Sequence, residues 1–180
     1  MEDYRRYYNL ESYLFEEVGP RFRERGRLSA FDFFCIVVWK NNNAKSRIRT
    51  LLRSKGEARD LNGVVEELTR ELWKKPSAKE KMRYLMEDWR FRLPIASAIL
   101  TVLEPDDFTV YDKRVADAVN ASDLQGLVWS DSLWNKYLEY REEVERQGPQ
   151  GLSLREKGRW LWGKNFHDAH KRWLTESPAE

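Results

Sequence analysis

The apolar run LPIASAILTVLEP, which begins at Leu93 and ends at Pro105, constrains the fold of this chain more than any other segment. When residues 95–103 are placed on a helix, apolar side chains occupy all sides of it. A helix without a polar face is stable in water only when other elements surround it. The rest of the chain is therefore expected to pack around this helix.

The length and composition of the chain predict one globular domain. It has 180 residues, of which 41% are hydrophobic and 34% charged, and both values suit a domain with a core of its own. No apolar run approaches the roughly 20 residues of a membrane span, and the start MEDYRRYYNLESY lacks a signal-peptide core, so we expect a cytoplasmic protein. The single cysteine, Cys35, excludes a disulfide framework and a multi-cysteine zinc site.

Helical periodicity and capping pairs predict helices along nearly the whole chain. Three pairs have the spacing of a capping box: Ser29 with Asp32, Ser77 with Glu80, and Ser153 with Glu156. The expected helices cover residues 3–18, 29–39, 46–56, 61–75, 77–88, 95–103, 115–119 and 132–147, and a last one starts at 153. The first ends before Gly19-Pro20. Two segments, FFCIVVW and FTVY, are rich in β-formers but too few to build a sheet, so we predict an all-α domain over residues 1–180.

The cations of the chain are clustered, although the net charge of +2 is too small to predict a nucleic-acid partner. Residues 40–59 hold seven basic residues against one acidic residue, and residues 21–27 (RFRERGR) hold four arginines against Glu24. A basic face built from these residues would suit phosphate contacts. An ordinary solvated helix surface is the alternative interpretation.

Three segments of the chain follow one another in a characteristic order: FDFFCIVVWKNNNAKSRIRTLL (31–52), DWRFRLPIASAILTVLEP (88–105) and FTVYDKRVADAV (108–119). This order resembles the helix-hairpin-helix superfamily of DNA glycosylases, which includes endonuclease III and 8-oxoguanine glycosylase. In that family an apolar helix ends in a loop with glutamine or asparagine. A hairpin then leads into a buried helix, and a proline-containing loop delivers an aspartate to the next helix. The resemblance implies a compact multi-helix glycosylase-like fold, with a helix-hairpin-helix-like element at residues 78–119.

Two positions depart from the family pattern. Arg90-Phe91-Arg92 stands where the family has a Gly-x-Gly turn, whose glycines let backbone N–H groups approach a DNA phosphate. Arginine side chains would replace that contact by a charge-assisted one. Leu93 or Pro94 stands where lyase-competent members carry a lysine, so no Schiff-base nucleophile is present at that position. The resemblance therefore implies a monofunctional glycosylase or a relative that has lost the chemistry.

Asp112 is the catalytic residue that the resemblance implies. Cleavage of an N-glycosidic bond builds positive charge on the sugar, and a nearby carboxylate can stabilise that charge or orient the attacking water. The dipole of a helix start favours a negative charge there, and the apolar segment 108–111 would anchor it against the core. The alternative is that Asp112 only caps the following helix, because aspartate is a preferred N-cap residue.

The predicted DNA contacts lie in the same segments. In the family, a residue of the asparagine loop fills the gap left by a flipped base, and Asn42 matches it best; a polar turn is the alternative. The predicted DNA-binding residues are Arg90, Arg92, Asn41, Asn42, Asn43, Lys40, Lys45, Lys113 and Arg114. The predicted base-pocket residues are Trp39, Trp89 and Tyr111, since aromatic rings stack on bases.

Three functions remain open from the sequence. The first is a DNA glycosylase that removes a damaged or modified base in base-excision repair, and the second is a catalytically inactive DNA-binding relative. The third is a helical protein–protein interaction domain with SLREKGRWLWGKNFHDAHKRW as its exposed face. We expect duplex DNA as the partner of a monomer that associates with the nucleoid when bound, with no membrane contact and no cofactor. His167 and His170 have a metal-binding spacing, but without a third ligand nearby we expect no metal site.

Overall fold

The computed structural model describes residues 3–55, 60–121 and 123–175, and all regular elements within these ranges are helical. They are η1 (Tyr4–Tyr7), α1 (Leu10–Tyr13), η2 (Leu14–Val18), α2 (Gly19–Arg25), α3 (Ala30–Asn41), η3 (Asn42–Ala44), α4 (Lys45–Lys55), α5 (Leu61–Trp73), α6 (Ala78–Arg83), η4 (Tyr84–Asp88), α7 (Leu93–Leu103), α8 (Lys113–Ala118), α9 (Asp131–Gln147) and α10 (Leu154–Thr175). FFCIVVW is helical and FTVY is extended without strand pairing, so the all-α prediction is confirmed for these residues. The predicted helix end at Gly56 lies outside the described ranges.

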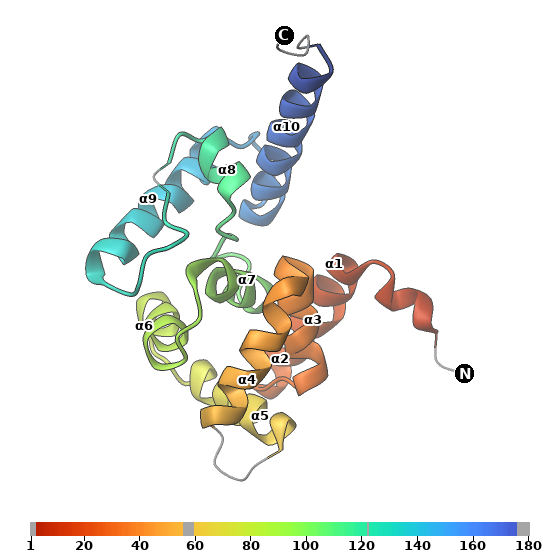
Figure 1. Cartoon of the computed structure of the whole chain (residues 1–180), viewed down its shortest axis with the longest axis vertical. Coiled ribbons are helices and arrows are strands. Elements are labelled where there is room, and N and C mark those ends of the chain that lie inside the picture. The colour runs from red at the N-terminus through yellow and green to blue at the C-terminus, as the bar shows by residue number, and fades with distance from the viewer. Residues whose placement is uncertain (1–2, 56–59, 122, 176–180) are drawn as a thin grey trace, which may run out of the picture.

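Helix α7 lies at the centre of the molecule (Figure 1). Ten of its eleven residues are buried, and the one exception is Pro94. Helices α2, α3 and α6 and the π-helical turns η2 and η4 all pack against it. The buried hydrophobic side chains of these elements form one connected core. The prediction of a helix surrounded on all sides is therefore confirmed.

The first helical stretch continues through Gly19-Pro20, where the sequence predicted its end. Proline inside a helix loses an N–H bond and clashes with the preceding turn. Here η2 is a π-helix, in which the N–H of Gly19 donates to the carbonyl oxygen of Leu14, and Pro20, which has no N–H to pair, follows as the second residue of α2. Gly19 lets α2 approach α7 closely, because a Cβ at this position would lie 2.6 Å from the carbonyl oxygen of Val102.

The predicted serine caps are present. The Oγ atoms of the three serines accept backbone N–H groups at 3.1 Å (Ser29 from Asp32), 3.2 Å (Ser77 from Glu80) and 3.3 Å (Ser153 from Glu156). At Ser153 the box is reciprocal, because its N–H donates back to Glu156 Oε2 at 2.9 Å. The polar segment KNNNAK interrupts the helix as predicted, since α3 ends at Asn41 and the 3-10 turn η3 follows.

Helices α8, α9 and α10 pack together beyond α7, and the C-terminal half of α10 projects from the body (Figure 1). The buried residues of α10 are Leu154, Lys157, Gly158 and Leu161, and none of residues 162–175 is buried. The last fourteen residues of α10 therefore add nothing to the core. None of the described helices is long and apolar enough to cross a bilayer.

Candidate functional site

Two tyrosines of α9 fix the backbone that leads to Asp112. The hydroxyl of Tyr137 accepts the N–H of Thr109 at 3.1 Å and donates to the carbonyl oxygen of the same residue at 2.8 Å. The hydroxyl of Tyr140 donates to the carbonyl oxygen of Val110 at 2.9 Å. Burial raises the pKa of both tyrosines above the ordinary value, so both remain protonated donors at neutral pH. The extended segment before Asp112 is thereby held in one position.

Tyr111 is anchored from α7 and belongs to the core. Its N–H donates to the Oγ of Ser97 at 2.9 Å, which explains a buried serine inside the largely apolar central helix. Its hydroxyl accepts the N–H of Leu124 at 2.7 Å, and its side chain is fully buried. Tyr111 therefore supports Asp112 from behind, and no part of its side chain is exposed in this structure.

The two carboxylate oxygens of Asp112 have different partners. Oδ1 accepts a hydrogen bond from the backbone N–H of Arg114 at 3.0 Å and caps α8. Oδ2 accepts a hydrogen bond from the ammonium group of Lys40, on α3, at 2.6 Å. The side chain of Lys40 is 12% exposed and that of Asp112 is 26% exposed. The capping role is therefore confirmed, and the same residue forms a partly buried ion pair between α3 and α8.

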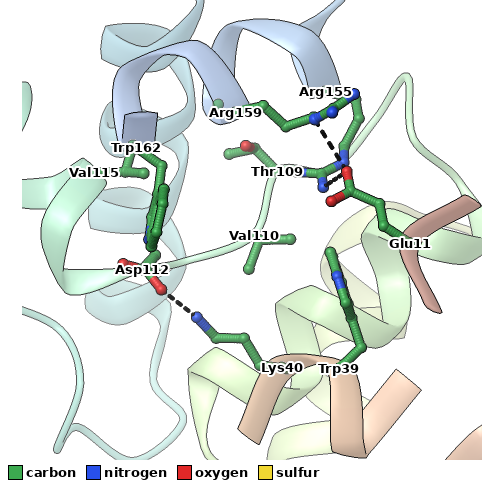
Figure 2. Close-up of a pocket in the computed structure, with 11 residues that line it drawn as sticks. Glu11, Trp39, Lys40, Thr109, Val110, Asp112, Val115, Arg155, Arg159 and Trp162 are labelled. Atoms are coloured by element: carbon green, nitrogen blue, oxygen red, sulfur yellow. Dashed lines mark hydrogen bonds and ion pairs between the residues drawn. The ribbon is translucent and has the colours of Figure 1, made fainter. Parts of the chain in front are cut away.

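A cleft of about 530 Å³ lies on one side of this ion pair, between α1 and α3 and the helices α8 and α10 (Figure 2). We call it the tryptophan cleft, because Trp39 and Trp162 line it together with Lys40, Asp112, Arg155 and Arg159. Trp162 lies beside Asp112, Trp39 lies across the cleft on α3, and Val110 lies between them (Figure 2). Two indole rings and the carboxylates of Asp112 and Glu11 thus line a shared space.

Arg155 lies at the end of the tryptophan cleft opposite Asp112 (Figure 2). Its guanidinium forms an ion pair with Glu11 of α1 and lies 5.2 Å from the ring centroid of Trp39 and 4.7 Å from that of Phe15. Arg159 pairs with the same Glu11 at 3.1 Å. Burial lowers the pKa of Arg155 and the charge of Glu11 opposes this shift, and a guanidinium remains charged at neutral pH. Trp39 is therefore kept rigid beneath a cation.

A second cleft, of about 770 Å³, lies on the other side of the ion pair. We call it the basic cleft, because its charged lining consists of five cations, Lys40, Arg47, Arg92, Lys113 and Arg114, and two carboxylates, Asp112 and Asp117. The excess of three positive charges creates a positive potential that attracts anions. Lys40 and Asp112 line both clefts, so their ion pair separates the two.

The segment Arg90-Phe91-Arg92 joins η4 to α7. Arg90 has a φ of +54°, a left-handed conformation that glycine adopts more easily. Phe91 is buried, and its N–H donates to the carbonyl oxygen of Leu85 at 3.0 Å. Arg92 lines the basic cleft and donates from Nη1 to the carbonyl oxygen of Gly126 at 2.8 Å, whereas Arg90 lies outside that cleft.

The structure brings most of the predicted site residues together. Those that line one or both clefts with Asp112 are Trp39, Lys40, Asn41, Arg92, Tyr111, Lys113 and Arg114. Asn42, Asn43 and Lys45 are exposed outside both clefts, and the ammonium of Lys45 donates to Asn42 Oδ1 at 2.8 Å. Trp89 packs beside the rings of Tyr84 and Phe91, with the ammonium of Lys55 at 5.4 Å from its ring centroid, and lines neither cleft.

The arginines of residues 21–27 do not contribute to the clefts. Arg21 forms an ion pair with Asp32 at 2.9 Å, and Arg23 donates from Nη1 to the carbonyl oxygen of Leu103 at 3.0 Å. These arginines therefore stabilise contacts between helices, and the basic surface at the site comes from other segments.

The sequence analysis did not identify five residues that shape the site: Glu11, Arg47, Arg155, Arg159 and Trp162. A signal was present for four of them, and that for Arg47 is its place in the basic segment 40–59, which was expected to suit phosphate contacts. Arg155, Arg159 and Trp162 are spaced by four and three residues, which places them on one face of a predicted helix. Glu11 carries no such signal, because its partner Arg155 is 144 residues away in the chain.

Comparison with protein-family models, with curated proteins and with solved structures gives no match for this chain. Within residues 3–55, 60–121 and 123–175, no group of three or more His, Cys, Asp or Glu side chains is placed to hold a metal ion. The two clefts, with Asp112 between them, are therefore the features of the structure that bear on function.

Proposed function

We propose that this chain is a DNA glycosylase-like base-excision protein without lyase activity. It hydrolyses the N-glycosidic bond of a damaged or modified base, and Asp112 stabilises the sugar cation or positions the water. The observation that carries this proposal is the location of one capped carboxylate between a tryptophan cleft and a basic cleft. In the fold that we propose, α6, η4, α7 and α8 form the helix-hairpin-helix-like element.

The tryptophan cleft has the properties that a flipped base needs. An enzyme that acts on a base must take it out of the duplex and stack it against aromatic or apolar side chains. Trp39 and Trp162 provide such faces, and the cleft volume of about 530 Å³ exceeds that of a single base. Asp112 lies at the edge of this cleft, where the sugar of an inserted nucleotide would follow.

The basic cleft has the properties that a DNA backbone needs. Phosphates provide most of the affinity of proteins for DNA, through contacts with lysine and arginine. Five cations line this cleft, and the first turn of α7 borders it at Pro94 and Ile95. The positive end of a helix dipole favours a phosphate at such a position. A backbone in this cleft would place a flipped nucleotide beside Asp112.

The chemistry assigned to Asp112 is hydrolysis. The bond between the sugar C1′ and the base nitrogen breaks, and the base departs with the bonding electron pair, which leaves positive charge on the sugar. The Asp112 carboxylate stabilises this charge, and a water oxygen then bonds to C1′ while the water loses a proton to the carboxylate or to solvent. The cap from Arg114 N–H keeps the carboxylate in place throughout.

The ion pair with Lys40 favours a second candidate function, that of a catalytically inactive DNA-binding relative. In the free protein the ammonium of Lys40 occupies Oδ2 of Asp112, the oxygen that would face the sugar. For catalysis, a DNA phosphate in the basic cleft must compete for this ammonium. If the ion pair persists in the complex, the carboxylate stays neutralised and the protein only binds.

The test is base release from duplexes that carry deaminated, oxidised, alkylated or hypermodified bases, followed by alkali to break abasic sites. We expect strand breaks after alkali with at least one lesion, and an Asp112→Asn rate lower by about 100-fold or more. Asp106→Asn is the matched control, since Asp106 is exposed and lines neither cleft. Breaks without alkali would contradict the absence of lyase activity.

Duplex binding separates the two candidates from each other. We expect salt-sensitive binding, and Arg47→Ala should reduce the slope of log K against log salt by about 1. Arg25→Ala is the control, because Arg25 is exposed and lies outside both clefts. Binding without release of any base supports the inactive relative, and absence of duplex binding at physiological salt excludes both candidates.

A further inference from the structure

The part of α10 that projects from the body carries a row of exposed aromatic rings. We call Trp162, Phe166, His170 and Trp173 the ring stripe. Their spacing of three or four residues places them on one face of the helix. Trp162, Phe166 and Trp173 are 41%, 45% and 69% exposed. Such rings add nothing to the core, and a contiguous exposed aromatic surface usually marks a binding site.

The rings of the stripe are parallel but offset. Successive ring centroids are 5.5 Å, 5.8 Å and 5.8 Å apart, and the planes differ by 5°, 5° and 22°. Parallel rings in direct stacking at this separation must be displaced sideways, so part of each face remains open. The stripe therefore presents aromatic faces, which is the kind of surface that planar bases stack on.

Cations accompany the stripe. The guanidinium of Arg114, from α8, lies 5.7 Å from the ring centroid of Trp162 and 5.8 Å from that of Phe166. Helix α10 has six lysines and arginines but only two carboxylates, Glu156 and Asp168. Ser153 holds Glu156 by a hydrogen bond, and Lys164 forms an ion pair with Asp168. Four of the six cations are also paired, Arg155 and Arg159 with Glu11, Lys157 with Glu145 and Lys164 with Asp168, and Lys171 and Arg172 line another cleft with Trp160. The positive charge that lies on the stripe itself is therefore that of Arg114.

The ring stripe also continues the site that is already described. Trp162, its first ring, lines the tryptophan cleft, and Arg114, which covers the first two rings, lines the basic cleft. Phe166, His170 and Trp173 follow in the later turns of α10, the helix whose C-terminal half projects from the body (Figure 1). A strand that leaves either cleft would reach the stripe directly.

We propose that the ring stripe binds an unpaired DNA strand by stacking of its bases. Paired bases inside a duplex do not offer their faces to side chains, whereas the bases of a single strand do. The inference rests on the DNA-binding part of the proposed function and is independent of base excision. It assigns α10 the role of holding single-stranded DNA next to the two clefts.

The test measures the affinity for a fluorescent oligo(dT) of about 16 nucleotides, near the upper end of the usual site size, and for a blunt duplex of equal length. We expect Phe166→Ala and Trp173→Ala each to weaken oligo(dT) binding about fivefold or more. Duplex binding should change by less than about twofold, because the duplex contacts lie in the basic cleft. Unchanged circular dichroism and thermal midpoint establish that the exposed substitutions leave the fold intact.

Trp160→Ala is the matched control for Trp173→Ala. Trp160 is 43% exposed on the same helix, but it lies on another side of α10, beside Lys164 and Asp168. It should leave oligo(dT) binding unchanged. Equal losses from Trp160→Ala and Trp173→Ala, or no loss from either stripe variant, would overturn the proposal.

Two further measurements test whether a second copy of the chain or a membrane, and not DNA, binds to the ring stripe. A third tests whether the stripe binds DNA independently of base excision. Concentration-dependent self-association that Trp173→Ala abolishes, with oligo(dT) binding retained, would overturn the inference and assign the stripe to a second copy of the chain. Binding to phosphatidylserine vesicles that is lost in the same way would assign it to a membrane. Asp112→Asn should bind oligo(dT) normally, so failure of base excision leaves this inference standing.

Discussion

The ion pair between Lys40 and Asp112 connects α3 to α8 across the two clefts, and its strength can be predicted from its burial. Exposed ion pairs contribute about 0.2–1 kcal/mol, and loss of one partner of a fully buried pair costs about 3–5 kcal/mol. With side chains 12% and 26% exposed, this pair lies between the two cases. We therefore expect a coupling free energy of about 1–2 kcal/mol.

A double-mutant cycle with Lys40→Met and Asp112→Asn measures this coupling. Methionine keeps the apolar stem of Lys40, and asparagine keeps an oxygen that can cap α8 through the N–H of Arg114. Urea unfolding gives the four free energies, and at an m-value of about 2 kcal/mol/M each single variant should unfold about 0.5–1 M earlier. The double variant should be more stable than the sum of the single changes predicts.

The pair of Lys113 and Asp117 provides a matched control within the same helix. It joins residues four apart, and its side chains are 50% and 51% exposed. Its coupling should be about 0.3–0.5 kcal/mol and should fall with added salt, because solvent screens exposed charges. A Lys40–Asp112 coupling no larger than that of this control would refute the reasoning, since the contact would then not connect the helices.

Three other perturbations test the fold around the site. Gly19→Ala should destabilise the protein by about 1–3 kcal/mol in urea unfolding, because its Cβ would lie 2.6 Å from the carbonyl oxygen of Val102; a stabilisation, as alanine gives in an open helix, would contradict this close approach. Ser97→Ala should cost about 1–3 kcal/mol in the same assay, because it leaves the buried N–H of Tyr111 without its partner. Burial raises the pKa of Cys35 to about 11 from 9.0, so at pH 8 the native thiol should react with Ellman's reagent about 100-fold more slowly than a thiol of pKa 9.0, and rapidly after unfolding.

The helices were largely predictable because their signals are local. Ser29 and Ser77 mark their helix starts within three residues, and the apolar run 95–103 reports burial directly. The continuation of the first helix through Gly19-Pro20 was not predictable. It depends on a π-helical turn and on the approach of α2 to the Val102 carbonyl, a contact between residues far apart in the chain.

The site was predicted only where its residues are close in sequence to a recognisable segment. Asp112, Arg92 and Lys113 lie in or near the segments that resemble the glycosylase pattern, and all three line the basic cleft. Trp89 is equally close in sequence but faces another way, whereas Trp162 reaches the tryptophan cleft from the last helix. Which tryptophan lines a cleft depends on helix packing, which periodicity does not report.

The capping and functional interpretations of Asp112 are compatible, because its two oxygens have separate partners. The bond from Arg114 N–H to Oδ1 fixes the side-chain torsions, so Oδ2 has to point toward Lys40 and the clefts. The hydrogen bonds of Tyr137 and Tyr140 to residues 109 and 110 fix the backbone on the other side of Asp112. A carboxylate held from both sides loses little conformational freedom when a sugar cation forms beside it, and such preorganisation is what electrostatic catalysis requires. The order of buried helix, apolar segment and capping aspartate therefore explains how this chain brings a charge to its core and directs one carboxylate oxygen, which Lys40 occupies in the free protein, toward the two clefts.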